Sequence, residues 1–220
     1  MAPSQREGLF PWIRRKLEKK ARRLAGRGRR LLGLSHTAPL GEPDVFELLR
    51  DRSVALVGNA QSLTGTDRGA VIDAHDLVIR CNAAPIPDVR SHGAKTDIIA
   101  TSIGFDAGVM DARRARYLFW MSPQRDDLPG WMLRWPGFFL FPEESHRVLL
   151  AAIGRRPTTG LMVIALLSRS PCRKVSLHGF DFFRSQSLSG VLRKATPHDP
   201  AAEERFVSDL VRADPRFSLN

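Results

Sequence analysis

The 220-residue chain has two cysteines, no Asn-x-Ser/Thr sequence and no apolar run of about 18 residues, the length of a transmembrane helix. Two cysteines exclude a fold held by several disulfides, and nothing in the sequence marks the chain as secreted. The six histidines lack the spacing of a zinc site, and no Gly-x-Ser-x-Gly turn supports serine hydrolase chemistry. These absences indicate a soluble protein that depends on a hydrophobic core.

The chain is 43% hydrophobic and 26% charged, which is typical of a globular domain. Its net charge of +11 is unevenly distributed: residues 1–40 carry 11 Lys and Arg against 2 acidic residues, and residues 41–220 carry 23 against 21. A domain that grips nucleic acid would carry its basic residues over the folded surface. The near-neutral body therefore argues against nucleic acid as its partner.

Residues 10–34 predict a basic helix, because Ile13, Leu17, Ala21 and Leu24 share one face and Lys or Arg fill most of the rest. A cationic amphipathic helix suits an anionic membrane surface. A solvated tail and a nucleic-acid-binding arm remain alternatives. Prolines and glycine after residue 34 indicate a linker, so we divide the chain into an arm and linker (1–42) and a single domain (43–220).

The domain alternates short apolar runs with helical segments, which predicts an α/β three-layer sandwich on a mostly parallel, Rossmann-like sheet. Ligands bind such sheets beyond the carboxyl ends of the strands. We expect a helix at 44–50, strands at 54–57, 77–79, 97–101, 117–120, 138–141 and 175–177, a buried helix at 160–169 and an amphipathic helix at 201–213.

Residues 57–63 place Gly58, Asn59 and Ser62 in the turn after the first strand. Glycine lets backbone N–H groups approach an anion closely, and the Asn59 amide can donate to a phosphate or a base. A plain turn with a left-handed asparagine is the alternative.

Arg80 and Asn82 follow the second strand, so a second amide is expected at the same sheet edge. For Arg80 we favour a structural ion pair with Asp73 or Asp76 over substrate binding.

Thr158, Thr159 and Gly160 directly precede the predicted buried helix. Hydroxyls at a helix N-terminus cap free N–H groups, and the same groups bind phosphate or carboxylate. His198 and Glu203 lie five positions apart at the start of the last helix. Histidine suits proton abstraction near neutral pH, although this pair alone favours a surface histidine and a helix-start carboxylate.

Together and in order, these segments resemble the sialyltransferase family of inverting glycosyltransferases (family 29). The runs 54–59 and 72–82 resemble its long donor-binding motif, 156–161 and 172–180 its short motif, and His198 with Glu203 its very short His-x4-Glu motif. The resemblance implies a GT-A-like fold and transfer of sialic acid, or a relative such as Kdo, from a CMP-sugar to an acceptor hydroxyl.

The resemblance also implies roles for the residues singled out. Asn59 and Asn82 contact the nucleotide and its phosphate, and Thr158, Thr159 and Gly160 bind the ribose and the donor carboxylate side. His198 is the general base on the acceptor hydroxyl, supported by Glu203. Because CMP is already a good leaving group, no metal and no cofactor are expected.

Two features depart from the family pattern. Residues 182–197 lack the histidine of a further family motif, so a phosphate contact made there in relatives must come from Arg184, Arg193 or Lys194, or be absent. Animal members join two cysteines of the long and short motifs; Cys172 matches one, but Val54 stands at the other position. The lost disulfide fits a reducing cytosol and a bacterial member.

We therefore expect a CMP-sugar-dependent transferase for a bacterial surface glycan, with a glycan or glycolipid acceptor. It is expected to be cytoplasmic and held peripherally at the inner membrane by residues 10–34. The alternative is a non-catalytic CMP-sugar-binding module at the membrane surface, suggested by the missing histidine motif.

Overall fold

The computed structural model describes residues 20–21, 24, 37–82, 85–126, 128–188 and 197–220. They form a seven-stranded sheet, ordered β5-β4-β3-β2-β1-β6-β7, in which every strand is parallel to its neighbours. The strands are β1 (Ser53–Val57), β2 (Leu77–Cys81), β3 (Ile98–Thr101), β4 (Tyr117–Trp120), β5 (Phe138–Leu140), β6 (Lys174–His178) and β7 (Phe217–Leu219). Successive strands leave β1 in one direction through β2 and in the other through β6, which opens a crevice at the strand ends.

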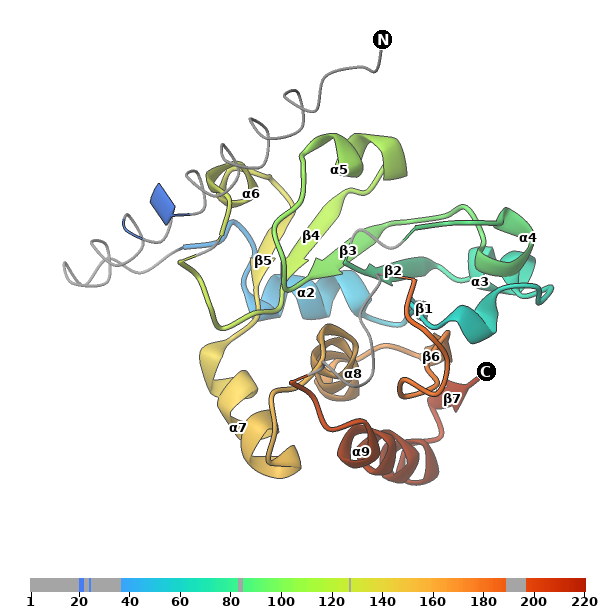
Figure 1. Cartoon of the computed structure of the whole chain (residues 1–220). Coiled ribbons are helices and arrows are strands. Elements are labelled where there is room, and N and C mark those ends of the chain that lie inside the picture. Colours follow the sequence, from blue (N-terminus) through green and yellow to red (C-terminus); the bar gives the residue numbers. More distant parts are fainter. Residues whose placement is uncertain (1–19, 22–23, 25–36, 83–84, 127, 189–196) are drawn as a thin grey trace, which may run out of the picture.

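Helices cover both faces of this sheet (Figure 1). One face packs against α2 (Glu42–Leu49), α7 (Glu143–Ile153), α8 (Thr159–Arg169) and α9 (Pro200–Ala213). The other packs against the 3-10 helix η1 (Gln61–Leu63), α3 (Gly69–Asp73), α5 (Gly108–Arg113) and α6 (Gly130–Leu133), with α4 (Val89–His92) beside α3. The predicted three-layer α/β architecture is thus confirmed, on a sheet that is entirely parallel within the described residues.

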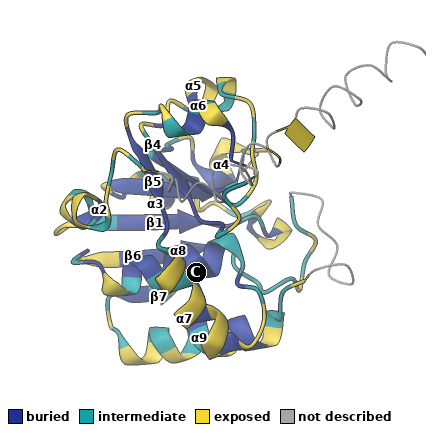
Figure 2. Ribbon diagram, turned by 90° about the vertical axis from the view of Figure 1, so that its left-hand side faces the viewer, coloured by how far each residue is buried: buried dark blue, intermediate teal, exposed yellow. Residues whose placement is uncertain are grey.

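The central strands β1, β2 and β3 are mostly apolar because both of their faces are buried (Figure 2), with the buried Arg80 of β2 as the charged exception. In β1, Val54 and Leu56 join the cluster under α8, whereas Ala55 and Val57 join the cluster under α3. This alternation fixes the register of β1, since a slip of one residue would exchange the two sets of side chains. The end of β1, and the turn after it, is therefore held rigidly between β2 and β6.

Several short elements were not expected from the sequence. They comprise β7, the helices α3 to α6, which have four to six residues each, and the longer helix α7. In α9 the buried residues are Ala202, Glu203 and Val207, whereas Phe206 and Leu210 are half-buried against the core.

The predicted basic helix at 10–34 lies largely outside the described residues. Of its positions the structure describes Lys20, Ala21 and Leu24, which are helical and exposed. Within the described part of the chain, no helix has both the length and the apolarity needed to cross a membrane.

Candidate active site

One cavity lies at the carboxyl end of the sheet, on the side toward which the strand arrows point in Figure 2. Its walls come from the turns after β1, β2 and β6, the N-terminus of α8 and the segment that leads into α9. The walls include predicted site residues from all of these segments: Gly58, Asn59, Asn82, Thr158, Thr159, Gly160, His198 and Glu203. Residues up to 145 positions apart in the sequence thus meet at one opening, as the strand-end rule predicts.

Gly58 allows the turns after β1 and β6 to touch. Its N–H donates to the His178 carbonyl at 2.8 Å, and a Cβ added at Gly58 would lie 2.4 Å from the Gly179 carbonyl oxygen. A real Cβ never approaches a backbone oxygen that closely, so no other residue fits here without moving the backbone. Gly179 itself has a φ of +67°, which glycine adopts without strain.

Two asparagine side chains present amide groups at this edge. The Asn59 Oδ1 atom is buried and has no hydrogen-bond partner among the described residues. Asn82 adopts a φ of +58°, and its Oδ1 accepts a long bond of 3.5 Å from the Ser102 N–H. Because a buried unpaired acceptor is costly, the Asn59 amide is suited to a ligand that donates a hydrogen bond.

Glu203 holds the first turn of α8 in place. Its two carboxylate oxygens accept hydrogen bonds from the Thr158 N–H at 2.7 Å and the Thr158 hydroxyl at 2.6 Å. The same hydroxyl accepts from the Leu161 N–H at 3.1 Å and so caps the helix. Glu203 is only 4% exposed, and its burial raises its pKa to about 7 although both hydrogen bonds favour the carboxylate.

Thr159 joins the helix to the other half of the sheet. Its hydroxyl donates to the Ser102 Oγ at 2.7 Å, just beyond β3. Gly160, next along, lies so close to the Phe180 ring that a Cβ there would be 2.6 Å from a ring carbon. The N-terminus of α8 is thereby fixed between the two halves of the cavity.

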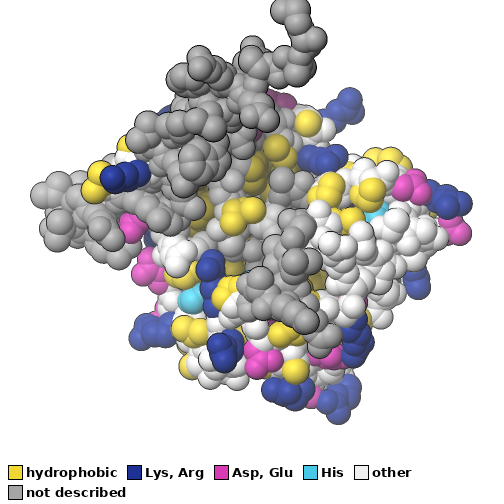
Figure 3. Space-filling model, viewed as in Figure 1, with side chains coloured by type: hydrophobic (Ala, Val, Ile, Leu, Met, Phe, Trp, Pro, Cys, Tyr) yellow, Lys and Arg dark blue, Asp and Glu magenta, His cyan; other side chains and the backbone are white. Residues whose placement is uncertain are grey.

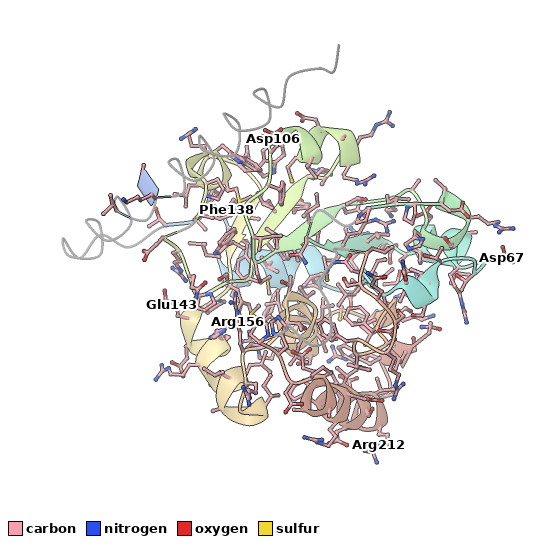
Figure 4. All side chains as sticks on the ribbon, in the orientation of Figure 1. Asp67, Asp106, Phe138, Glu143, Arg156 and Arg212 are labelled. Atoms are coloured by element: carbon pink, nitrogen blue, oxygen red, sulfur yellow. The ribbon has the colours of Figure 1, made fainter. Side chains whose placement is uncertain are left out.

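His198 is oriented by the chain just before α8. Its Nδ1 lies 2.7 Å from the carbonyl oxygen of Arg156, which is labelled beside the start of α8 in Figure 4. A carbonyl only accepts, so Nδ1 carries the proton and Nε2 is the basic atom of the neutral ring. Burial lowers the pKa of His198. The hydrogen bond to the Arg156 carbonyl acts against this shift, and the positive charge of Arg156 adds to it.

The turn after β6 contains aromatic residues in a strained conformation. Phe182 and Phe183 have φ values of +53° and +62°, a region that costs a bulky residue about 1 kcal/mol or more each. Asp181 stabilises the turn by accepting the Ser185 N–H at 2.8 Å. The Phe183 ring stacks on His198, with centroids 6.3 Å apart and planes 20° from parallel. These aromatics were not predicted as site residues, although their position shortly after a strand is a signal for a site at this sheet edge.

Some predicted residues lie elsewhere or are already engaged. Ser62 is exposed on η1, outside the cavity walls, and its N–H donates to the Ser185 hydroxyl. Arg184 forms an ion pair with Glu204 of α9, which partly neutralises its charge. Arg193 and Lys194 lie outside the described residues. Cys81 and Cys172 are both free and buried, and burial raises the pKa of Cys81 to about 12.

Arg80 is structural, as expected, but its partners differ from the prediction. Its guanidinium donates to the carbonyl oxygens of His92 and Lys95 and to the Thr96 hydroxyl, at 2.9 to 3.1 Å. Asp73 instead accepts the Ala94 and Lys95 N–H groups, and Asp76 binds Ser53. The end of α4 and the loop after it direct the His92 and Lys95 carbonyls toward Arg80, so the buried cation binds backbone there and forms no ion pair with the Asp73 and Asp76 carboxylates.

The arrangement combines two chemical functions within one opening. The N-terminus of α8 and the amides of Asn59 and Asn82 suit a phosphate, a carboxylate or a nucleotide. His198 supplies a basic nitrogen at the same cavity, fixed by a carbonyl and an aromatic ring. Within the described residues, no cluster of three His, Cys, Asp or Glu side chains could hold a metal ion.

The chain is similar to known sialyltransferases in part of its sequence and in its fold. Residues 34–121 match the sequence model of glycosyltransferase family 29 (sialyltransferase). A "Sialyltransferase-like protein 2" of rice, Oryza sativa subsp. indica, is 41% identical over 88 residues. This match covers 39% of the present chain and 19% of the rice protein, so the chain corresponds to about a fifth of that relative.

Solved sialyltransferase structures share the fold. A mammalian sialyltransferase superimposes with a TM-score of 0.60 and 20% identity, over 79% of this chain and 70% of that one. The Campylobacter jejuni sialyltransferase CstII, solved with the substrate analogue CMP-3FNeuAc, gives a TM-score of 0.52 and 16% identity over 76% and 78%. The match over residues 34–121 and the shared fold confirm the predicted resemblance to the sialyltransferases of glycosyltransferase family 29.

Proposed function

We propose that this protein transfers sialic acid, or a related acidic sugar such as Kdo, from a CMP-sugar to a hydroxyl group of an acceptor glycan. The observation that carries the proposal is the placement of His198. Its Nδ1 is bonded to the Arg156 carbonyl, two residues before the Thr158 cap of an anion-binding helix terminus. A base and an anion site thus lie within one short stretch of structure.

In this proposal the donor binds across the ends of β1 and β2. The amides of Asn59 and Asn82 contact the nucleotide and its phosphate, where the unpaired Asn59 Oδ1 accepts from a donor group such as the cytosine amine. The first turn of α8, with Thr158, Thr159 and Gly160, receives the donor's ribose and carboxylate. The contact between Gly58 and Gly179 keeps this floor free of side chains.

In the transfer step, His198 Nε2 takes the proton of the acceptor hydroxyl. The acceptor oxygen forms a bond to the anomeric carbon while the bond from that carbon to the CMP phosphate oxygen breaks, and CMP leaves with the electron pair. Attack on the face opposite CMP inverts the anomeric configuration. Because burial lowers the pKa of His198, its ring is neutral and able to accept a proton at pH 7.

The direct test is CMP release from CMP-sialic acid and from CMP-Kdo, in the presence of glycolipid acceptors and with and without a metal chelator. We expect release that the chelator leaves unchanged. His198→Ala is expected to reduce turnover by about a thousandfold or more while CMP still raises the melting temperature. His146→Ala, which alters a half-buried histidine of α7 outside the cavity, is the matched control. Absence of both CMP release and CMP-dependent stabilisation would refute the proposal.

A binding module without catalysis is the second candidate. The segment 182–197 has no histidine, and Arg184, a candidate replacement, is paired with Glu204. Donor binding with no turnover on any acceptor, together with identical behaviour of the wild type and His198→Ala, would favour this function.

For localisation we propose a bacterial, cytoplasmic protein that binds the inner membrane through residues 10–34. Two features support it: the net charge of +9 on residues 1–40 and the interspersed acidic and basic side chains of the body (Figure 3). Ala38, in the predicted linker, packs against the apolar cluster that Trp131 and Trp135 also contact. Binding to anionic but not neutral vesicles tests this, and salt-sensitive binding to nucleic acid alone would overturn it.

A further inference from the structure

Phe183 and His198 come from two separate segments that meet only in the folded protein. Phe183 lies in the turn after β6, and His198 lies just before α9. Their rings are stacked at a centroid distance of 6.3 Å and an angle of 20°. Both residues line the cavity.

The backbone at Phe183 is unfavourable for the residue it carries. Phe182 and Phe183 are consecutive left-handed residues, and neither is the glycine or asparagine that this conformation favours. Glycine in the same turn would remove the conformational cost, and Gly179 does so four residues earlier. A bulky aromatic retained at such a position indicates that its ring has a role that offsets the strain.

The hydrogen bond to Arg156 holds one atom of the His198 ring. A single bond to the carbonyl at 2.7 Å fixes the position of Nδ1 but does not by itself define the plane of the ring. An aromatic ring packed against the imidazole restrains that plane and so the direction of Nε2. The carbonyl and the phenyl ring therefore restrain the imidazole along two different directions.

We propose that Phe183 is a positioning residue, whose stacked ring holds the His198 imidazole in the orientation needed to accept the acceptor proton. The inference rests on the proposed transferase function for its kinetic consequence. The strained turn of residues 181–185 is the scaffold that presents the phenyl ring, with Asp181 bonded to the Ser185 N–H.

Three variants separate the effect of the Phe183 ring from the effect of the backbone conformation. Phe183→Gly removes the ring and keeps the turn, because glycine adopts a positive φ freely. Phe183→Tyr retains the stacked face and is expected to behave as the wild type. Phe182→Leu is the control for the spectroscopic readout, since Phe182 lines the same cavity and shares the left-handed backbone but packs against the core cluster.

The first readout is the proton NMR spectrum of the His198 ring in the full chain, which needs no substrate. A stacked phenyl ring shifts these protons upfield, so Phe183→Gly should lose the shift while Phe183→Tyr and Phe182→Leu keep it. An unchanged His198 spectrum in Phe183→Gly would overturn the proposal even if the protein proved to be no transferase.

The second readout is steady-state kinetics with a CMP-sugar and an acceptor. Phe183→Gly is expected to lower kcat by about ten- to a hundredfold, because a misaligned base costs rate, while CMP affinity changes by less than about twofold. Wild-type kcat in Phe183→Gly would overturn the proposal. Lack of turnover in every variant would refute the proposed function, and the NMR result would still decide whether Phe183 orients His198.

Discussion

Two regions of the molecule each bury a charged side chain, and the two side chains differ in the position of their hydrogen-bond partners. Arg80 is 1% exposed, and its donors end on loop carbonyls at the sheet face. Glu203 is 4% exposed, and its acceptors hold Thr158 at the mouth of the cavity. The hydrogen bonds of Arg80 stabilise only the scaffold, whereas those of Glu203 stabilise the cavity surface that a ligand would contact. Burial of a charge alone therefore does not mark a functional site.

The largest effect is expected from Arg80→Met, which removes the cation and leaves the His92 and Lys95 carbonyls without their donor. The loss in the free energy of unfolding should be about 3 to 5 kcal/mol, measured by urea denaturation. Since Arg80 does not line the cavity, the CMP affinity of the folded fraction should stay unchanged. A weakened CMP affinity would show that the two regions are not separate.

The second prediction uses pH. Burial raises the pKa of Glu203 to about 7 in the folded protein, above its ordinary value near 4.5, so the folded state holds this proton more tightly than the unfolded state. The contribution of Glu203 is therefore fully present below pH 4.5 and is lost as the pH rises through 7, by up to about 3 kcal/mol. Arg80, whose pKa is lowered to about 10, stays charged throughout this range.

Histidines with lowered pKa values, such as His178 and His198, act in the opposite direction over the same range. The measurement is therefore the difference in unfolding free energy between the wild type and Glu203→Gln from pH 4 to 8. A difference that does not change with pH would contradict the raised pKa.

The smallest effect is expected from Thr158→Val, which removes the hydroxyl that caps α8 and donates to Glu203. Stability should fall by about 1 to 2 kcal/mol, and CMP should bind more weakly because the first turn loosens. Ser168→Ala, at the other end of α8, removes a hydroxyl that donates to the Ala165 carbonyl. This control should change neither quantity measurably, as followed by thermal unfolding with and without CMP.

Much of the scaffold was predictable because its strands are buried on both faces. The run at 117–120 was predicted with the bounds that the structure gives it, and the helix at 160–169 differs by one residue. The strand β7 was not predicted, since three residues that pass from buried Phe217 to exposed Leu219 carry little signal. The short helices α3 to α6 are each no longer than two turns, so no periodicity develops in their sequences.

The cavity was predictable to the extent that it follows strand ends and a helix terminus. Asn59, Asn82 and Thr158 each come directly after or before a regular element, and they do meet. Contacts across the chain could not be predicted, because nothing local pairs Glu203 with Thr158 or Phe183 with His198. Ser62 was selected for its closeness in sequence to Asn59, but η1 turns that segment away from the cavity.

Hydrogen bonds at two points join the segment before α8 to the beginning of α9. His198 binds the Arg156 carbonyl and Glu203 binds Thr158, on either side of Pro157. His198 is thus held by contacts across the chain, to a carbonyl 42 residues earlier and to its stacked neighbour. We expect changes in the length of the loop that precedes His198 to leave the histidine in place, because these contacts and not the loop set its position.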